Sequence, residues 1–302
     1  MSRSHRRPRL ALPFTILTDR DTVRLVAGED FRYTLTGPGL SDWLPDWLTA
    51  LDGRVPLEEA LGQLAQERRE PARQLVDRLY GERVLIDGTA LAAHVPARWR
   101  LRPEGSAAWA AGWQPGGETP PPNPLPATER GSKPSAVSSS PPLPLGEGVG
   151  GEGFFLPALC QDRLDHDEAL RFNRRCLDTA TPWLWASTGP MSRAYVSPLF
   201  LPDAGPCLSC LLYHFRRLSP VPELYDALTE HARSGRPIVP VPFPLQAIAI
   251  IQQLLLWKAA LGAEAVPPAA LYRLHVLEVA SMEVTTHRVF VDPECPECGG
   301  RN

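Results

Sequence analysis

Four of the six cysteines form two Cys-x-x-Cys units, the residues in this sequence whose types and spacing are best suited to chemistry. Cys207 and Cys210 make up the first unit, and 84 residues separate it from the second unit, Cys295 and Cys298. Each unit places two thiolates on one side of a tight turn, so that together they supply four sulfurs for a tetrahedral zinc ion. We therefore predict a structural zinc site with no open coordination position. A redox-active pair is the alternative, but it would account for only one of the two units.

The other candidate reactive residues have no partners at a useful spacing. Cys160 and Cys176 are predicted to be small buried apolar residues. His287 lies on an alternating apolar segment that leads to Cys295. It is a candidate for a residue that contacts the metal ligands without binding the metal itself. The sequence has neither a Gly-x-Ser-x-Gly elbow nor a cysteine paired with a base, so we predict no catalytic residue.

Proline separates the 302 residues into three parts. Of the 34 prolines, 11 lie between residues 103 and 153, together with 10 glycines. Such a composition cannot bury enough apolar surface to offset its ordering entropy, so 103–153 is predicted to be a disordered insert. Gly146 to Gly151 within it match the pattern GxGxxG, but an apolar strand does not precede them and a helix does not follow. We therefore predict no phosphate-binding loop there.

Residues 12–95 have the pattern of a small sheet followed by three helices and a strand. Apolar residues alternate with polar ones over 23–25 and 31–35, which indicates antiparallel strands joined by a turn at 28–30. Helical spacing follows over 40–51 and 56–64, and a third helix is predicted to start at Pro71. A short strand at 84–86 completes a winged helix-turn-helix-like module.

The charge of this module argues against DNA as its partner. The whole chain has a net charge of −3, but residues 12–95 hold 14 acidic and 9 basic side chains, a net charge of −5. Contacts to phosphate supply most non-specific affinity for DNA, so an acidic module is a poor DNA binder. An exposed strand edge beside a helix can instead accept an extended peptide as an added strand. A zinc-containing winged-helix transcription regulator remains an alternative.

The stretch from Trp43 to Ile86, which includes LTALDGRVPLEEALGQLAQ and ARQLVDRLYGERVLID, resembles a PqqD-type peptide-recognition element. That family binds the leader segment of ribosomally made precursor peptides as an added strand beside the third sheet strand and the third helix. The resemblance implies a leader-binding role for the following residues: Phe31, Tyr33, Leu35, Leu75, Arg78 and Leu79.

Residues 154–302 alternate between helical and extended patterns, which predicts an α/β arrangement. Strands are expected at 154–159, 181–186 and 195–201, with a helix over 165–178. The apolar stretch 245–261 carries Gln246 and Lys258 and is predicted to be a buried helix rather than a membrane span. The basic N-terminus lacks a signal-peptide cleavage site, so we expect a cytoplasmic protein with reduced cysteines.

This half resembles the C-terminal part of the ThiF-like, ubiquitin-activating type of fold. The residues that carry the resemblance are Asn173-Arg174-Arg175-Cys176, Thr181-Pro182-Trp183-Leu184, the GPCLSC turn at 205–210, the helix 244–262, and His287 with 293–298. Combined with the first module, they resemble the leader-binding partner protein of thiazole/oxazole-modified peptide (TOMM) biosynthesis, the cyclodehydratase "bacteriocin biosynthesis" family. The resemblance implies that the chain presents a precursor peptide to a YcaO-type enzyme, which uses ATP to form azolines.

One departure from the ThiF-like pattern concerns ATP. A complete ThiF-like domain begins with a Gly-rich strand–turn–helix that holds ATP, and the Pro/Gly insert stands where that half would be. We therefore expect no adenylation by this chain, although a ThiF-type sulfur-carrier or peptide adenylyltransferase remains the enzymatic alternative.

The expected partners are a leader peptide and a YcaO-type cyclodehydratase, without nucleic acid or membrane. A homodimer is compatible with the sequence. Overall we predict an α/β fold for the partial ThiF-like domain and an α+β class for the whole chain. A structural zinc ion is expected to cross-link the partial ThiF-like domain.

Overall fold

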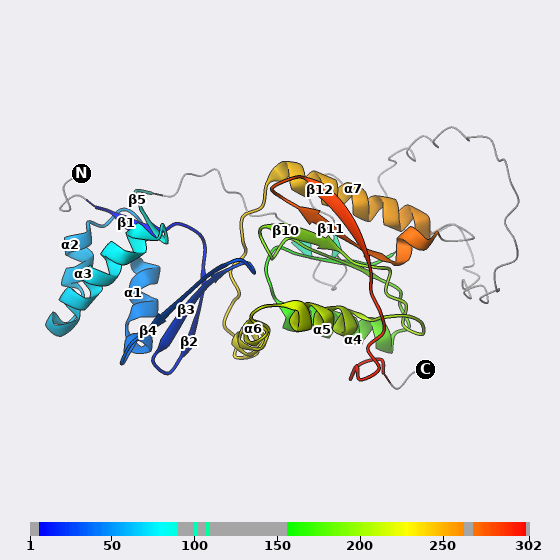
Figure 1. Ribbon diagram of the computed structural model, residues 1–302, viewed down its shortest axis with the longest axis horizontal. Helices are drawn as coiled ribbons and strands as arrows, with labels where there is room; N and C mark the ends of the chain where they lie inside the picture. Colours follow the sequence, from blue (N-terminus) through cyan, green and yellow to red (C-terminus); the bar gives the residue numbers. More distant parts are fainter. Residues whose placement is uncertain (1–5, 90–99, 102–106, 109–155, 263–267, 300–302) are drawn as a thin grey trace, which may run out of the picture.

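The computed structural model describes residues 6–89, 100–101, 107–108, 156–262 and 268–299, which form two parts lying side by side (Figure 1). The elements of the N-terminal part are β1 (Pro8–Leu10), β2 (Thr15–Asp19), β3 (Thr22–Ala27), β4 (Phe31–Thr36), η2 (Leu40–Asp42), α1 (Leu44–Ala50), α2 (Leu57–Gly62), α3 (Gln66–Gly81) and β5 (Leu85–Asp87). The elements that follow are β6 (Arg100–Leu101), β7 (Ala107–Ala108), β8 (Ala158–Gln161), α4 (His166–Asp178), β9 (Leu184–Ser187), β10 (Arg193–Val196), α5 (Leu208–Leu218), α6 (Glu223–Arg233), α7 (Leu245–Gly262), η3 (Ala269–Tyr272), β11 (Arg273–Glu278) and β12 (Glu283–Arg288). Apart from β7, the predicted insert 103–153 lies outside the described residues, as do its GxGxxG pattern and the expected strand start at 154–155.

The N-terminal sheet is antiparallel and has the order β2-β3-β4. Val23 pairs with Leu35 and Leu25 with Tyr33, so the alternating residues of both strands face the same core. The strands turn at 28–30, as predicted from the sequence. β1 precedes residue 12, the predicted boundary of the module, and pairs with β5.

Three helices cover one face of this sheet, and the third begins earlier than predicted. α3 starts at Gln66, and Pro71 lies inside it rather than at its first turn. The preceding residues 66–70 are Gln, Glu and Arg, which are good helix formers. Their propensity and the packing of Ala72, Val76 and Leu79 in the core outweigh the one backbone hydrogen bond that the proline cannot donate.

The C-terminal sheet is mixed and has the order β12-β11-β10-β9-β8. The coarse prediction of an α/β architecture is confirmed, but only β8 and β9 are parallel among the described strand pairs of this sheet. Five residues connect β9 to β10, which is too few for the crossover that a parallel pair requires. β9 and β10 therefore pair in an antiparallel manner.

Helices cover both faces of this sheet (Figure 1). Leu184 and Ala186 of β9 face α7, whereas Trp185 between them faces α4 and α5. This alternation is what a strand buried on both faces requires. α7 is long and apolar enough to cross a membrane by length and composition alone, and a third of its 18-residue window is buried in the protein. Its buried residues pack on the sheet, whereas Leu245 and Trp257 are exposed, so the helix that the sequence predicts to be buried is buried along one face only.

α5 and α6 were not predicted from the sequence, and α6 joins the two parts of the molecule. Leu224 and Leu228 of α6 pack against Leu17 of β2 and Val26 of β3. The N-terminal sheet is thereby covered on one face by its own helices and on the other by α6. The two parts consequently share a buried apolar contact.

Candidate functional site

The two Cys-x-x-Cys units meet at one end of α5. Cys207 is the N-cap residue of α5 and Cys210 lies in its first turn. Cys295 and Cys298 lie in the turns that follow β12. All four side chains are buried, at most 8% exposed, and none forms a disulfide.

The sulfur positions fit a tetrahedral metal ion. The Sγ atoms of the four cysteines all lie within 4.8 Å of one another. Cys207 Sγ is 3.9 Å from Cys210 Sγ and 3.6 Å from Cys295 Sγ, and Cys210 Sγ is 3.4 Å from Cys298 Sγ. Zinc–sulfur bonds of ~2.3 Å in a tetrahedron place sulfurs ~3.8 Å apart. The four cysteines can therefore hold a metal ion.

The hydrogen bond within the first cysteine pair favours ionisation of Cys210 over Cys207. The Cys207 thiol donates to Cys210 Sγ, which lowers the pKa of Cys210 to about 5 and raises the pKa of Cys207. The backbone N–H of Asp292 also donates to Cys210 Sγ, at 3.4 Å. Burial raises the pKa of Cys298 to about 12. A bound divalent cation would lower the pKa of the coordinating thiols, because its positive charge stabilises the thiolate form.

Two neighbouring residues of α4 hold the two cysteine turns. The Asn173 side-chain oxygen accepts a hydrogen bond from the backbone N–H of Leu208, directly after Cys207, at 3.1 Å. Arg174 forms a bidentate ion pair with Glu297, directly before Cys298. Both residues belong to the stretch that carries the ThiF-like resemblance. They link α4 to each half of the cluster.

The other predicted candidates do not belong to this cluster. Cys160 is buried on β8 in the core beneath α7, and burial raises its pKa. Cys176 is buried on α4, and burial raises its pKa to about 11. His287 is exposed on β12, where its Nε2 lies 3.0 Å from the Thr285 hydroxyl. It is therefore not among the ligands that the geometry brings together.

β4 is the edge strand predicted to accept a peptide, and its outer side has no partner strand among the described residues. Four of its six residues are exposed. The Tyr33 hydroxyl donates to the carbonyl of Glu82, the C-cap residue of α3, at 3.1 Å. The strand edge and the end of the third helix therefore lie close together.

The six predicted peptide-binding residues differ in accessibility. Phe31 is 46% exposed, and Arg78 is exposed on α3 with an ion pair to Glu82 at 3.1 Å. Tyr33 and Leu75 are partly buried against the core, whereas Leu35 and Leu79 are buried in it. Direct contact with a peptide thus stays a prediction for the first four residues. Leu35 and Leu79 hold β4 and α3 in place.

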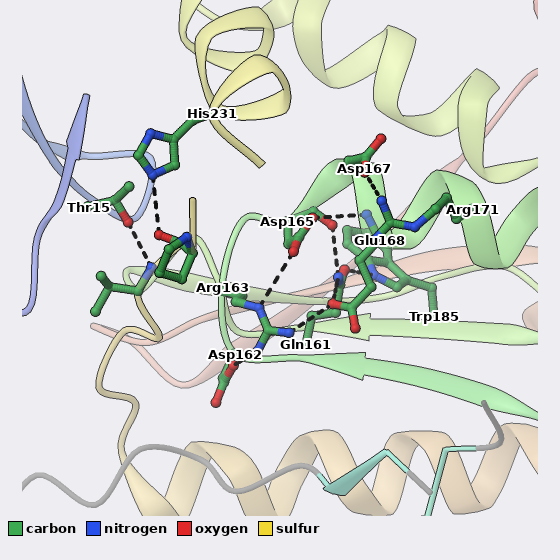
Figure 2. A network of polar contacts seen from close by, with 12 residues as sticks. Thr15, Gln161, Asp162, Arg163, Asp165, Asp167, Glu168, Arg171, Trp185 and His231 are labelled. Atoms are coloured by element: carbon green, nitrogen blue, oxygen red, sulfur yellow. Dashed lines mark hydrogen bonds and ion pairs between the residues drawn. The ribbon is translucent and has the colours of Figure 1, made fainter. Parts of the chain in front are cut away.

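A polar network occupies the C-terminal end of β8 and the first turn of α4 (Figure 2). The Gln161 amide donates to Asp165 and Glu168, and its oxygen accepts from the Trp185 indole at 2.9 Å. The Asp165 carboxylate caps α4 by accepting from the Glu168 N–H, and Arg163 pairs with Glu168 at 3.1 Å. Because these carboxylates are all partnered, the network positions α4 and offers no free acid or base.

Sequence reasoning missed a buried polar contact that centres on Glu29. Its carboxylate accepts from the Tyr225 hydroxyl at 2.9 Å, from Arg193 at 3.0 Å and from the Tyr195 hydroxyl at 3.4 Å. Burial, followed by the Glu29 charge, raises the pKa of both tyrosines. A glutamate in a Gly-Glu-Asp turn is typical of exposed hairpins, so the sequence carried no signal for this burial.

Comparison with known proteins found no matching family model and no matching curated protein. Solved structures similar to the chain include a heterocyclase in complex with substrate and cofactor, with 16% identity and a TM-score of 0.35 over 97% of this chain and 39% of that one. E. coli MccB shows 16% identity and a TM-score of 0.34 over 48% of this chain and 39% of that one. A chain of the E. coli microcin synthetase McbBCD complex shows 11% identity and a TM-score of 0.38, over 95% of this chain and 99% of that one. The chain thus spans about two fifths of the length of the heterocyclase and of MccB. With TM-scores below 0.5, these likenesses define neither the fold nor the activity of the chain.

Proposed function

We propose that the chain is a non-catalytic partner protein that binds the leader segment of a ribosomally made precursor peptide. It presents that precursor to a YcaO-type cyclodehydratase, which forms the azolines. The observation that carries this proposal is the unpaired edge of β4 beside the end of α3 in an acidic module. The resemblance of Trp43–Ile86 to a PqqD-type element supports the same function.

The physical basis for peptide binding is strand addition. An edge strand presents a row of backbone N–H and C=O groups, and an extended peptide can satisfy them without a sequence-specific pocket. Side chains along the edge then supply selectivity. Phe31 is exposed at the start of β4, where a peptide side chain can pack on its ring.

We further propose that the four-cysteine cluster holds a structural zinc ion. Four buried thiols at these separations fill a tetrahedron, which leaves no position for a substrate. Bound zinc would supply a cross-link between α5 and the C-terminal turns. Asn173 and Arg174 would keep both cysteine turns oriented toward it.

Peptide affinity tests the leader-binding function. The open reading frames beside this gene are first searched for a short Cys/Ser/Thr-rich precursor, and the leader of that precursor is synthesised with a fluorescein label and measured by fluorescence polarisation. We expect saturable binding that weakens at least ~10-fold in Phe31→Ala, a loss of about 1.4 kcal/mol. Trp257→Ala is the matched control, because Trp257 is 42% exposed on α7, far from β4 in sequence, and should bind as the wild type does.

The outcomes separate this function from its alternatives. An absence of saturable binding would contradict the leader-binding function. ATP–pyrophosphate exchange by the purified chain would instead favour a ThiF-type adenylyltransferase. Salt-dependent binding of duplex DNA would favour a transcription regulator.

A further inference from the structure

A cavity of about 440 Å³ lies at the junction of the two parts, and His287 is the one residue singled out from the sequence that lines it. The turn before β4 and Arg32 form one wall, α5 contributes Leu211 and Phe215, and Arg288 and Phe290 at the end of β12 form the opposite side. We refer to this space as the junction cavity. Its floor is apolar, since the rings of Tyr195 and Phe215 stack there with centroids 4.6 Å apart.

A second cavity, of about 170 Å³, lies along β4 and shares the lining residue Arg32 with the junction cavity. Arg32, Tyr33 and Thr34 line it, opposite Val221 and Leu224 at the start of α6. Arg32 lines both cavities, and residues 219–220 of the junction cavity continue directly into Val221. The two hollows therefore follow β4 from its middle to its N-terminal end.

The direction of an added strand determines which part of a peptide arrives at the junction cavity. A strand that pairs antiparallel with β4 has its C-terminal end beside Phe31, the first residue of β4. Each further peptide residue advances ~3.3 Å, so the next few residues pass Asp30 and enter the cavity. They are the residues that follow the leader strand toward the modified region.

The charges around the junction cavity indicate what this segment contains. Among the residues that the structure describes, Arg32 and Arg288 form no ion pair, and Arg288 lies over the Phe290 ring at 5.0 Å. Glu29 and Asp30 also line the cavity, and both face Arg193, which lies 3.0 Å from the Glu29 carboxylate and 3.7 Å from that of Asp30. Asp30 also accepts a hydrogen bond from the Ser192 hydroxyl. Two cations without anionic partners thus border an apolar floor. A carboxylate next to an apolar side chain complements both features.

We propose that the junction cavity binds the precursor segment that directly follows the leader strand, through an apolar side chain and an adjacent acidic one. The inference rests on the proposed leader-binding function and extends it from one strand edge to a site built by both parts. The cavity then holds the precursor where the two parts meet, which orients the chain that runs on to the partner enzyme.

Two labelled peptides test this inference with the full-length protein: the leader alone, and the leader extended by its next ten residues. We expect the extended peptide to bind at least ~10-fold more tightly to the wild type by fluorescence polarisation. Arg288→Glu should abolish this gain while the leader alone binds as before, because Arg288 lies on β12 and not on β4. Arg217→Glu is the matched control on exposed α5 surface outside the cavity, and it should retain the gain.

The results distinguish failure of the junction-cavity site from failure of the leader-binding function. Leader binding without any gain from the extension, or a gain that survives Arg288→Glu, overturns the junction site and leaves the leader-binding function standing. Replacing the acidic residues of the extension by alanine must also remove the gain, or the charge argument is wrong. If neither peptide binds, both proposals fail.

Discussion

At the scale of single residues, the four cysteines are the clearest case of distant positions brought to one point. Their sulfurs lie within 4.8 Å of one another although the two units are far apart in sequence. Bringing four thiols together without a metal gains little, because the hydrogen bond to Cys210 raises the pKa of the Cys207 thiol and burial raises the pKa of the Cys298 thiol. The unfolded chain does not contain the assembled site, so the free energy of metal binding adds to the stability of the folded chain.

Replacing one ligand should therefore remove the metal. We expect one zinc per wild-type chain and almost none in Cys298→Ser, measured by inductively coupled plasma mass spectrometry. The free energy of unfolding should fall by on the order of 4 kcal/mol or more. Cys176→Ala removes a buried thiol outside the cluster and should retain the zinc. A metal-free wild type that is folded would refute the four-thiolate site.

His166 makes the stability depend on pH. Burial lowers the pKa of this side chain to about 4, below its ordinary value of 6.5, and its ring stacks on Tyr225. As the pH falls below 6.5, the unfolded chain takes up a proton that the folded chain refuses, so stability present above pH 6.5 is lost toward pH 4. Between pH 7 and pH 5 this one group should cost about 2 kcal/mol.

Urea unfolding at both pH values measures this effect. The wild type should lose about 2 kcal/mol more between pH 7 and pH 5 than His166→Phe does. The comparison uses the difference between the two proteins because other groups also contribute in this range, among them His275, whose pKa burial lowers to about 4. Equal pH dependence of both proteins would show that His166 does not contribute.

At the scale of elements, the turn between β3 and β4 fits closely against the C-terminal part. Gly28 has a φ of +71°, and an added Cβ would lie 2.2 Å from the carbonyl oxygen of Pro190. The following N–H, of Glu29, donates to that same oxygen at 3.2 Å. The turn thus requires glycine both for its left-handed conformation and for the close approach.

Gly28→Ala should consequently destabilise the protein by more than backbone strain alone. Gly235→Ala is the matched control, because Gly235 has a φ of +79° and its added Cβ would meet nothing within 4 Å. We expect a loss of about 1 kcal/mol for Gly235→Ala and at least twice that for Gly28→Ala. Chemical denaturation of both variants measures the difference, and equal losses would contradict the close contact at Pro190.

At the scale of the whole molecule, Glu29 joins the two parts by a buried charge. Its carboxylate is held by Arg193, Tyr195 and Tyr225, all of which belong to the C-terminal part. Glu29→Ala would leave a partly buried guanidinium and two buried hydroxyls without this acceptor. Such a loss costs about 3 kcal/mol.

Limited proteolysis and urea unfolding test this coupling. We expect Glu29→Ala to unfold at lower urea and to be cleaved faster between the two parts than the wild type. Asp30→Ala is the control: Asp30 accepts a hydrogen bond from Ser192 and lies 3.7 Å from Arg193, but it is half-exposed, so its removal should cost much less, about 1 kcal/mol or below. Unchanged stability of Glu29→Ala would mean that the other contacts, such as the apolar contact of α6 and the turn at Gly28, hold the two parts together without this charge.

Local sequence patterns were sufficient to predict the elements whose residues interact with near neighbours. The hairpin of β3 and β4 follows from strict alternation, and the N-terminal helices follow from helical spacing of apolar residues. α5 was missed because its first turn carries Cys207 and Cys210, whose spacing indicates a metal-binding turn rather than a helix. The antiparallel pairing of β9 with β10 depends on the length of the connection, which the pattern of strands did not reveal.

The sequence by itself determined the two cysteine pairs, the net negative charge of the N-terminal module and the α/β architecture, because residue spacing and composition are local properties. Only the tertiary structure decided that Glu29 is buried, that Asn173 and Arg174 support the cysteine turns, and that Arg32 and Arg288 face one cavity. These contacts join residues up to about two hundred positions apart. Their geometry depends on how α6 and the C-terminal sheet pack against the N-terminal part, and no local pattern encodes that packing.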